Sequence, residues 1–275
     1  MHPLLAQCTG TCPVLSQVEF VTGPRPFFRV NGKRMTGLTK RIARILPVPK
    51  HNARQCPSCR RKRSRAKLVH ACGVTMHSSR SKKARRALAP IGAARRDDRL
   101  ARCMGASARA HGSIVDRQLT ALAAGTRVAP LDGCTASLLA YIHRRGWVLL
   151  ATQLPMYSPT LGIATAIDLV CTDAATRTQC IVCEVKATRT HGLDSQLTDE
   201  TCYTAARTTI DAFPASYYIQ HQLQLFSMWY ALHVEARVPV HAALVLRASP
   251  GGVDVYPLPS AWKRQPQPVL DLLRS

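Results

Sequence analysis

The chain has 275 residues, enough for one sizeable domain with an extension or for two small domains. Its 38 Lys and Arg outnumber 15 Asp and Glu, giving a formal net charge of +23, which indicates a polyanionic partner such as nucleic acid, although a solvated tail or an import signal gives the same count. No apolar run approaches the roughly 18 residues of a membrane helix and no secretory signal starts the chain, so we expect an intracellular protein with no membrane partner and 11 reduced cysteines.

The positive charge is concentrated near the start of the chain. Residues 1–100 hold 23 Lys and Arg against three acids, including the clusters "KRIAR", "RRKRSRAK" and "SKKARR". Few aromatic residues and little amphipathic period accompany them, so we expect residues 1–98 to be a basic, largely disordered region. Basic clusters of this kind serve as phosphate-contacting arms and as nuclear import signals. Both roles predict a nuclear protein if the source is eukaryotic or viral.

A "CPSC" motif lies inside this basic region. Cys56 and Cys59 are followed by His70, Cys72 and His77, and a C-x2-C pair with a later His/Cys pair can close a tetrahedral Zn²⁺ site. The second half fits no standard finger spacing. Unpaired thiols in a flexible arm are therefore the alternative.

From residue 99 to residue 275 the sequence alternates between helical and strand-like patterns, which predicts a second, folded domain. The helical periods cover residues 100–124, 135–146, 198–210, 216–234 and 261–275. The strand-like runs cover residues 147–154, 162–171, 180–187, 241–248 and 252–258. Residues 172–179 form a turn of the length that a hairpin uses. This order predicts an α/β fold in which helices flank a mixed central sheet.

Two charged residues stand inside the apolar run "CIVCEVKA". Glu184 and Lys186 lie one residue apart in what is predicted to be a buried strand, where charges are costly unless they are paired or bound to a metal. Because side chains alternate along a strand, both share a face with Val182, while Cys183 and Val185 take the other face. A structural ion pair on an edge strand is the simplest interpretation.

Asp168 changes that interpretation. It lies 16 residues before Glu184, and pairing of the two strands as a hairpin brings both carboxylates to one side of the sheet. Carboxylate oxygens are hard ligands for Mg²⁺ or Mn²⁺, which can polarise a phosphate and activate a bound water. Lys186 would then orient that water or stabilise the charge that develops on the phosphate.

The pattern Gly162-x-x-x-x-Ile-Asp168, the tripeptide Glu184-Val-Lys186 and the later helix "YYIQHQLQLFSMW" together resemble the PD-(D/E)XK nuclease superfamily. The branch containing lambda exonuclease, YqaJ-type viral recombinases and the RecB nuclease domain is the most similar, over roughly residues 100–250. The resemblance implies a restriction-endonuclease-like core. It also implies a Mg²⁺-dependent deoxyribonuclease, exonuclease favoured over endonuclease, that acts on DNA (RNA not excluded) in recombination, repair or processing of replication intermediates.

The resemblance also assigns roles to individual residues. Asp168, Glu184 and the carbonyl of Val185 correspond to metal ligands, and Lys186 corresponds to the catalytic lysine. Gln220 and Gln222 both fit the glutamine that approaches the site from the later helix. The first helix of the family carries an acid or a histidine four residues after a glycine, and here Asp116 stands four after Gly112, with His111 as the alternative.

Asp116 and His111 are five residues apart, or about 140° around a helix, so only one of them can face the sheet. The spacing favours Asp116, and Gly112 would let this helix approach the sheet closely. Mn²⁺ could substitute for Mg²⁺, more readily if the ligand is His111.

The chain departs from the family in two places. Gln153 stands in the strand before Asp168, where a glutamate is common, and Cys180 and Cys183 should point to opposite faces of their strand, which suits packing and not an iron–sulfur cluster. His191 and His221 have no assigned role. Two other functions stay open: a non-catalytic nucleic-acid-binding protein with a nuclease-like fold, and a zinc-dependent nuclear regulator that acts through residues 40–80.

Overall fold

The computed structural model describes residues 18–21, 27–46, 110–187 and 217–275. Five predicted features lie wholly or partly outside these residues: the zinc motif at Cys56 and Cys59, the basic clusters after residue 46, the helix over 198–210, the start of the helix over 100–124, and His191. Within the described residues, no helix is long and apolar enough to cross a membrane.

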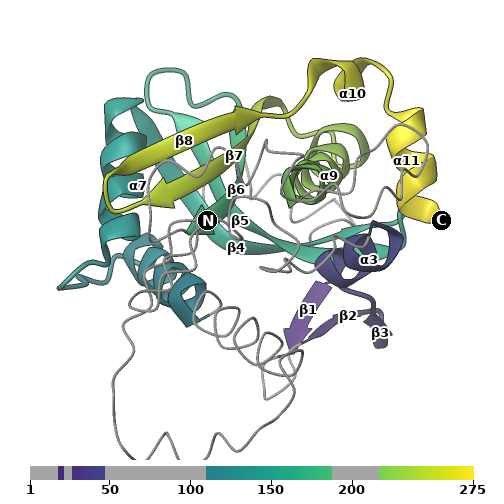
Figure 1. The fold of residues 1–275 in the computed structure, drawn as a ribbon, viewed down its shortest axis with the longest axis horizontal. Coiled ribbons are helices and arrows are strands. Elements are labelled where there is room, and N and C mark those ends of the chain that lie inside the picture. The colour runs from purple at the N-terminus through teal and green to yellow at the C-terminus, as the bar shows by residue number, and fades with distance from the viewer. Residues whose placement is uncertain (1–17, 22–26, 47–109, 188–216) are drawn as a thin grey trace, which may run out of the picture.

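A five-stranded mixed sheet forms the centre of the fold (Figure 1). Its spatial order follows the chain order, and all neighbours are antiparallel except β6 and β7, which are parallel. The predicted mixed α/β fold is therefore confirmed. The five strands are β4 (Trp147–Ser158), β5 (Ile163–Asp173), β6 (Cys180–Ala187), β7 (Val240–Ser249) and β8 (Gly252–Pro257).

The predicted hairpin between β5 and β6 is present. Asp173 closes its turn by accepting the backbone N–H groups of Ala175 and Thr176 at 2.8 and 3.2 Å. The side chains of β6 alternate as expected, because Cys180 and Val182 pack into one hydrophobic core while Cys183 packs into the other. Both cysteines are buried, and their places in different cores confirm that they pack on opposite faces.

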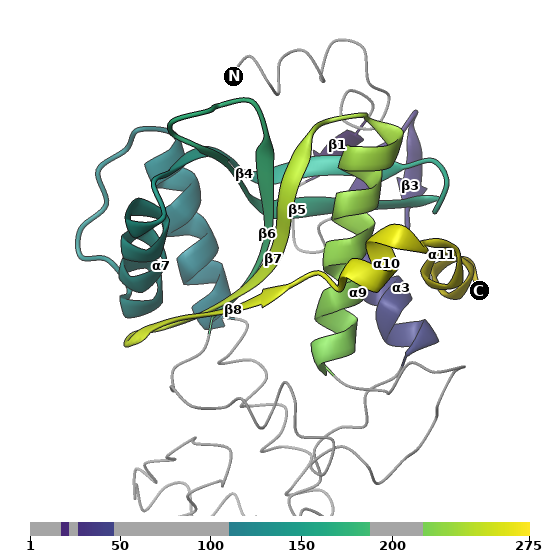
Figure 2. The ribbon, with the colours of Figure 1, turned by 90° about the horizontal axis from the view of Figure 1, so that it is seen from above.

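Helices cover both faces of the sheet, as Figure 2 shows. On one side lie α9 (Tyr217–Trp229), its π-helical continuation (Tyr230–Glu235), and the short helices α10 (Ser260–Arg264) and α11 (Gln267–Arg274). On the other side lie α7 (Gly133–Arg144) and the helix over residues 110–123.

Two helix boundaries differ from the prediction. α7 begins two residues early because Asp132 caps it, accepting the N–H of Cys134 at 2.9 Å. The predicted C-terminal helix is split into α10 and α11. Pro266 accounts for the break, since a proline disfavours helical backbone at the residue before it, here Gln265 with φ −130° and ψ 79°.

Residues 18–21 and 27–46 differ most from the prediction, which places them in the low-order region. They form a small antiparallel sheet and a helix, α3, whose apolar face is part of the same core as α9. The buried side chains of that face are Leu38, Ile42 and Ile45, followed by Leu46. Lys40, Arg41 and Arg44 lie between these apolar residues, and their charge led to the prediction of a low-order region. The elements are β1 (Val18–Val21), β2 (Phe27–Val30), β3 (Lys33–Met35) and α3 (Leu38–Ile45).

Candidate active site

Asp168 lies where β5 and β6 stop pairing. Their ladder runs from Thr172 opposite Cys180 to Leu169 opposite Cys183 and then ends. At the next position the Asp168 side chain replaces the ladder, and its Oδ2 accepts the backbone N–H of Val185 at 2.8 Å. The carboxylate is thereby held beside the segment of β6 that carries the other two charged residues.

Glu184 and Lys186 form an ion pair on this segment of β6. The Glu184 residue is only 3% exposed, so its charge is almost completely removed from water. The Lys186 side chain is 30% exposed, so the cost of desolvation falls mainly on Glu184, whose charge must be offset by close partners. The pair lies in the third of five strands, not on an edge strand.

Gln153 on β4 completes the environment of Asp168. Its Nε2 donates to Asp168 Oδ1 at 3.1 Å, and its backbone has a positive φ of 47°, a conformation that a non-glycine residue adopts at some energetic cost. Both Asp168 oxygens are therefore hydrogen-bonded. An ionised glutamate at residue 153 could not donate this bond, so a glutamine at this position is the better partner for the Asp168 carboxylate.

Asp116 on the helix over residues 110–123 adds a third carboxylate. Burial and, secondarily, the charge of Asp168 raise its pKa to about 6. Burial and Asp168 also raise the pKa of Glu184 to about 7, and burial raises that of Asp168. For Lys186, burial alone would lower the pKa, but the carboxylates together outweigh it and raise the pKa. Three acids thus surround one ammonium, and the cluster favours an additional positive charge.

The raised pKa of Asp116 predicts a gain in stability on its neutralisation. Because its folded-state pKa of about 6 exceeds the ordinary 3.8, its contribution is present at low pH and is lost as pH rises through about 6. In metal-free buffer at pH 8, Asp116→Asn should therefore melt roughly 2–4 °C higher than the wild type, the shift that about 1 kcal/mol produces in a domain of this size. Thermal melts at pH 8 and pH 4 check this, and an equal gain at both values would contradict it.

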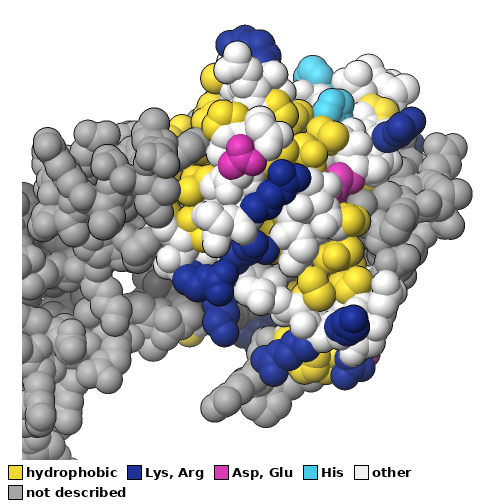
Figure 3. Space-filling view, turned by 90° about the vertical axis from the view of Figure 1, so that its right-hand side faces the viewer, with side chains coloured by type: hydrophobic (Ala, Val, Ile, Leu, Met, Phe, Trp, Pro, Cys, Tyr) yellow, Lys and Arg dark blue, Asp and Glu magenta, His cyan; other side chains and the backbone are white. Residues whose placement is uncertain are grey.

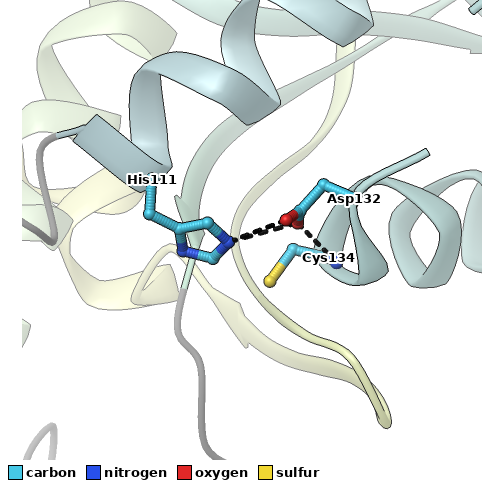
Figure 4. A group of neighbouring side chains, drawn as sticks. All are labelled: His111, Asp132 and Cys134. Atoms are coloured by element: carbon cyan, nitrogen blue, oxygen red, sulfur yellow. Dashed lines mark hydrogen bonds and ion pairs between the residues drawn. The ribbon is translucent and has the colours of Figure 1, made fainter. Parts of the chain in front are cut away.

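His111, the alternative to Asp116, lies in a different cluster. Its Nε2 is 3.1 Å from Asp132 Oδ2 and 3.2 Å from Oδ1, and the donor atoms of His111, Asp132 and Cys134 all lie within 4.8 Å of one another. This buried group, drawn in Figure 4, could hold a metal ion. His111 therefore does not join the three carboxylates.

The prediction that Gly112 lets this helix approach the sheet closely is wrong. An added Cβ there would meet no described atom within 4 Å, so the close approach of this helix does not require a glycine.

The two predicted glutamines donate hydrogen bonds to main-chain carbonyls. Gln220 Nε2 donates to Leu46 O at 2.6 Å, and Gln222 Nε2 donates to Pro257 O at 3.4 Å. Between them, His221 is the member of α9 affected by the site, since burial and then the charge of Lys186 lower its pKa well below the usual value. Successive residues of a helix are rotated by about 100° around its axis. His221 therefore points in a different direction from Gln220 and Gln222.

Arg247 is a second residue that the sequence interpretation missed. It stands directly beside Lys186 in the parallel pairing of β6 with β7 and is only 5% exposed, with Nη1 3.9 Å from Asp254 Oδ2. Residues opposite each other in adjacent strands share a face of the sheet. The argument already applied to Glu184, a charge inside an apolar run, would have identified Arg247 as well.

Comparison with known proteins adds no assignment, because no family model matches the chain and no curated protein matches it. The interpretation of these residues therefore rests on their geometry and charge.

Proposed function

We propose that the chain is a Mg²⁺-dependent nuclease that hydrolyses phosphodiester bonds in DNA, on a restriction-endonuclease-like core. The observation that carries the proposal is the cluster of Asp116, Asp168, Glu184 and Lys186 at the point where β5 and β6 separate, in which Glu184 is buried and the other three are half-buried. Buried charge of this kind is expensive, and perturbed acids gathered around one lysine are typical of functional sites.

The chemistry of the donor set suits a hard divalent cation. Among the described residues, however, only the donor atoms of His111, Asp132 and Cys134 all lie within 4.8 Å of one another, so the three carboxylates must move closer together to share an ion. Asp116, Asp168 and Glu184 offer carboxylate oxygens, to which the resemblance adds the carbonyl of Val185, and Mg²⁺ prefers oxygen ligands of this kind. The pKa values of Asp116 and Glu184 are raised, which means that the protein alone does not fully stabilise their negative charges. A bound Mg²⁺ would supply that compensation, and it would polarise the phosphate and acidify an attacking water.

Lys186 is suited to act on the phosphate. The surrounding carboxylates raise its pKa, so it keeps its proton at neutral pH, and its ion pair with Glu184 positions the ammonium. A fixed positive charge in a site sheltered from water stabilises the negative charge that develops on the phosphate oxygens. Arg247, beside it in the sheet, is a second cation on the same row, with the guanidinium geometry that suits phosphate.

DNA is the proposed substrate because the chain is strongly cationic. The net charge of +23 provides the sequence-independent attraction to a phosphate backbone. On the face that carries α3 and α11, Lys and Arg side chains outnumber Asp and Glu (Figure 3). Exposed basic residues of those two helices are Lys40, Arg44 and Arg274.

The direct test is incubation of the full chain with end-labelled linear DNA, circular DNA and single-stranded RNA, each with Mg²⁺ or with EDTA. We expect Mg²⁺-dependent loss of linear DNA, and exonuclease action predicts that covalently closed circles survive. Binding of DNA without any cleavage, in Mg²⁺ and in Mn²⁺, would instead favour the non-catalytic nucleic-acid-binding protein. Cleavage of RNA alone would reassign the substrate.

The basic segment over residues 60–67 should raise affinity for DNA without acting in cleavage. Deleting the whole region up to residue 98 is unsuitable as a test, because it removes α3 and its core side chains. Replacing Arg60, Arg61, Arg63 and Arg65 with Gln avoids this. If all four contact phosphates, the slope of log K against log salt should fall by roughly 0.9 for each, about 3.6 in total.

Fluorescence anisotropy across a salt series measures that slope, and the cleavage rate at saturating enzyme is the control. An unchanged slope would leave the segment as a targeting signal only.

A further inference from the structure

We propose that His111, Asp132 and Cys134 form a second metal site, selective for Zn²⁺ or a similar transition-metal ion, that fastens the helix over residues 110–123 to the start of α7. This site is separate from the carboxylate cluster and does not depend on the proposed nuclease activity. Figure 4 shows the His111 ring reaching from one helix toward the Asp132 carboxylate and the Cys134 sulfur at the beginning of the other.

The spacing of the donor atoms is close to that of a filled site. The donors all lie within 4.8 Å of one another, and His111 Nε2 is 3.1 Å from Asp132 Oδ2. Two ligands of a tetrahedral zinc ion at about 2.0–2.1 Å from the metal are separated by roughly 3.3 Å. The imidazole and the carboxylate therefore need only a small adjustment to share an ion.

The chemistry of the donors selects the metal. Thiolate and imidazole are ligands that suit zinc and other transition metals, whereas Mg²⁺ requires oxygen donors. One nitrogen, one oxygen and one sulfur thus exclude the ion proposed for the carboxylate cluster. Two chemically different sites in one domain are expected to take two different ions.

The residues are held in place by bonds that a metal would not disturb. Asp132 Oδ1 accepts the N–H of Cys134 at 2.9 Å, and the Asp132 N–H donates to Gln118 Oε1 at 2.9 Å. Gln118 in turn donates to Pro130 O at 3.1 Å. One side chain of the first helix therefore fixes the loop that leads into α7. Such supporting contacts are what orient ligands at established metal sites.

Two of the three proposed ligands are shielded from solvent. Cys134 is fully buried and His111 is 6% exposed, while the Asp132 side chain is 24% exposed. Solvent reaches the site beside Asp132, so water is the natural fourth ligand. Binding releases the thiol proton of Cys134, whereas His111 would bind through Nε2 as a neutral imidazole with its proton on Nδ1. Affinity should therefore fall as pH falls.

The site has a structural consequence for the carboxylate cluster. Asp116 lies little more than one turn beyond His111 on the same helix, so an ion at His111 would fix the helix that carries Asp116. The proposed zinc is thus a structural ion that stabilises this helix and not a catalytic one.

The experiment uses the purified full chain loaded with Zn²⁺ or with Co²⁺ after chelation. The comparison includes wild type, Cys134→Ser, His111→Gln and, as a matched control, Cys171→Ser, which alters a buried free cysteine outside the cluster. A double Cys56→Ser, Cys59→Ser variant removes any ion bound in the basic region. Metal content is measured by mass spectrometry and the Co²⁺ spectrum reports thiolate ligation.

We expect the Cys134→Ser and His111→Gln variants to lose one equivalent of metal, and the Cys171→Ser variant to keep it. The thiolate-to-cobalt absorption should persist in the double variant and disappear with Cys134→Ser. His111→Gln keeps an amide able to bond Asp132 and so remains informative if Cys134→Ser fails to fold. A wild-type chain that binds no ion at stoichiometric Zn²⁺, or a cobalt spectrum indifferent to Cys134 and His111, overturns the proposal.

Discussion

Replacing Lys186 with alanine should lower the rate of DNA cleavage about 10²-fold or more and leave DNA binding in place. The loss of one charge-stabilising group at a reacting centre has consequences of this size. Lys186 is a single cation among three carboxylates, and it contributes little to a DNA interface that the rest of a +23 chain provides. Single-turnover cleavage and anisotropy binding, measured on the same preparation, separate the two effects.

Asp168→Asn and Glu184→Gln should abolish cleavage for a related reason. Each removes a proposed metal ligand and keeps the size of the side chain. Asp173→Asn is the matched control, because Asp173 lies on the same strand and its carboxylate accepts backbone N–H groups of its own turn. Undiminished cleavage by Lys186→Ala, or equal losses from Asp168→Asn and Asp173→Asn, would sink the assignment.

The strands of the central sheet could be predicted because their signals are local. β6 was bounded by polar residues and a turn, and its bounds match the prediction. α3 could not be recognised in the same way. The three apolar residues Leu38, Ile42 and Ile45 are a weak helical signal, and the core that buries them is formed by residues far away in the sequence. In the sequence, three basic residues between them carried the stronger signal.

The site was predictable to the extent that strand pairing determines it. Once β5 and β6 form a hairpin, Asp168 and Glu184 must lie near each other. The orientation of α9 was not predictable, because its rotation follows from how Leu223, Phe226 and their neighbours pack against the sheet. Sequence spacing therefore pointed to Gln220 and Gln222, whereas His221 is the residue whose pKa burial and then the charge of Lys186 lower.

Substitution of Asp116, but not of His111, should change the Mg²⁺ requirement for cleavage. Asp116→Ala removes a carboxylate beside Asp168 and Lys186, so the Mg²⁺ concentration for half-maximal cleavage should rise about tenfold or more, as it does when even a supporting group of a metal site is lost. His111→Ala removes a partner of Asp132, so it should lower thermal stability and leave the Mg²⁺ requirement close to that of the wild type.

The pH dependence of the Mg²⁺ requirement gives a second test of the same ligands. Glu184 and Asp116 have pKa values raised to about 7 and about 6, and each must lose its proton before it binds a cation. The Mg²⁺ requirement should therefore be constant above pH 8 and increase as pH falls through 7 and then 6, by up to about tenfold per pH unit for each proton displaced. Asp116→Asn should retain the step near 7 and lose the step near 6. If His111→Ala removes a step instead, and the wild type prefers Mn²⁺, the histidine is the ligand and the helix is rotated relative to the one described.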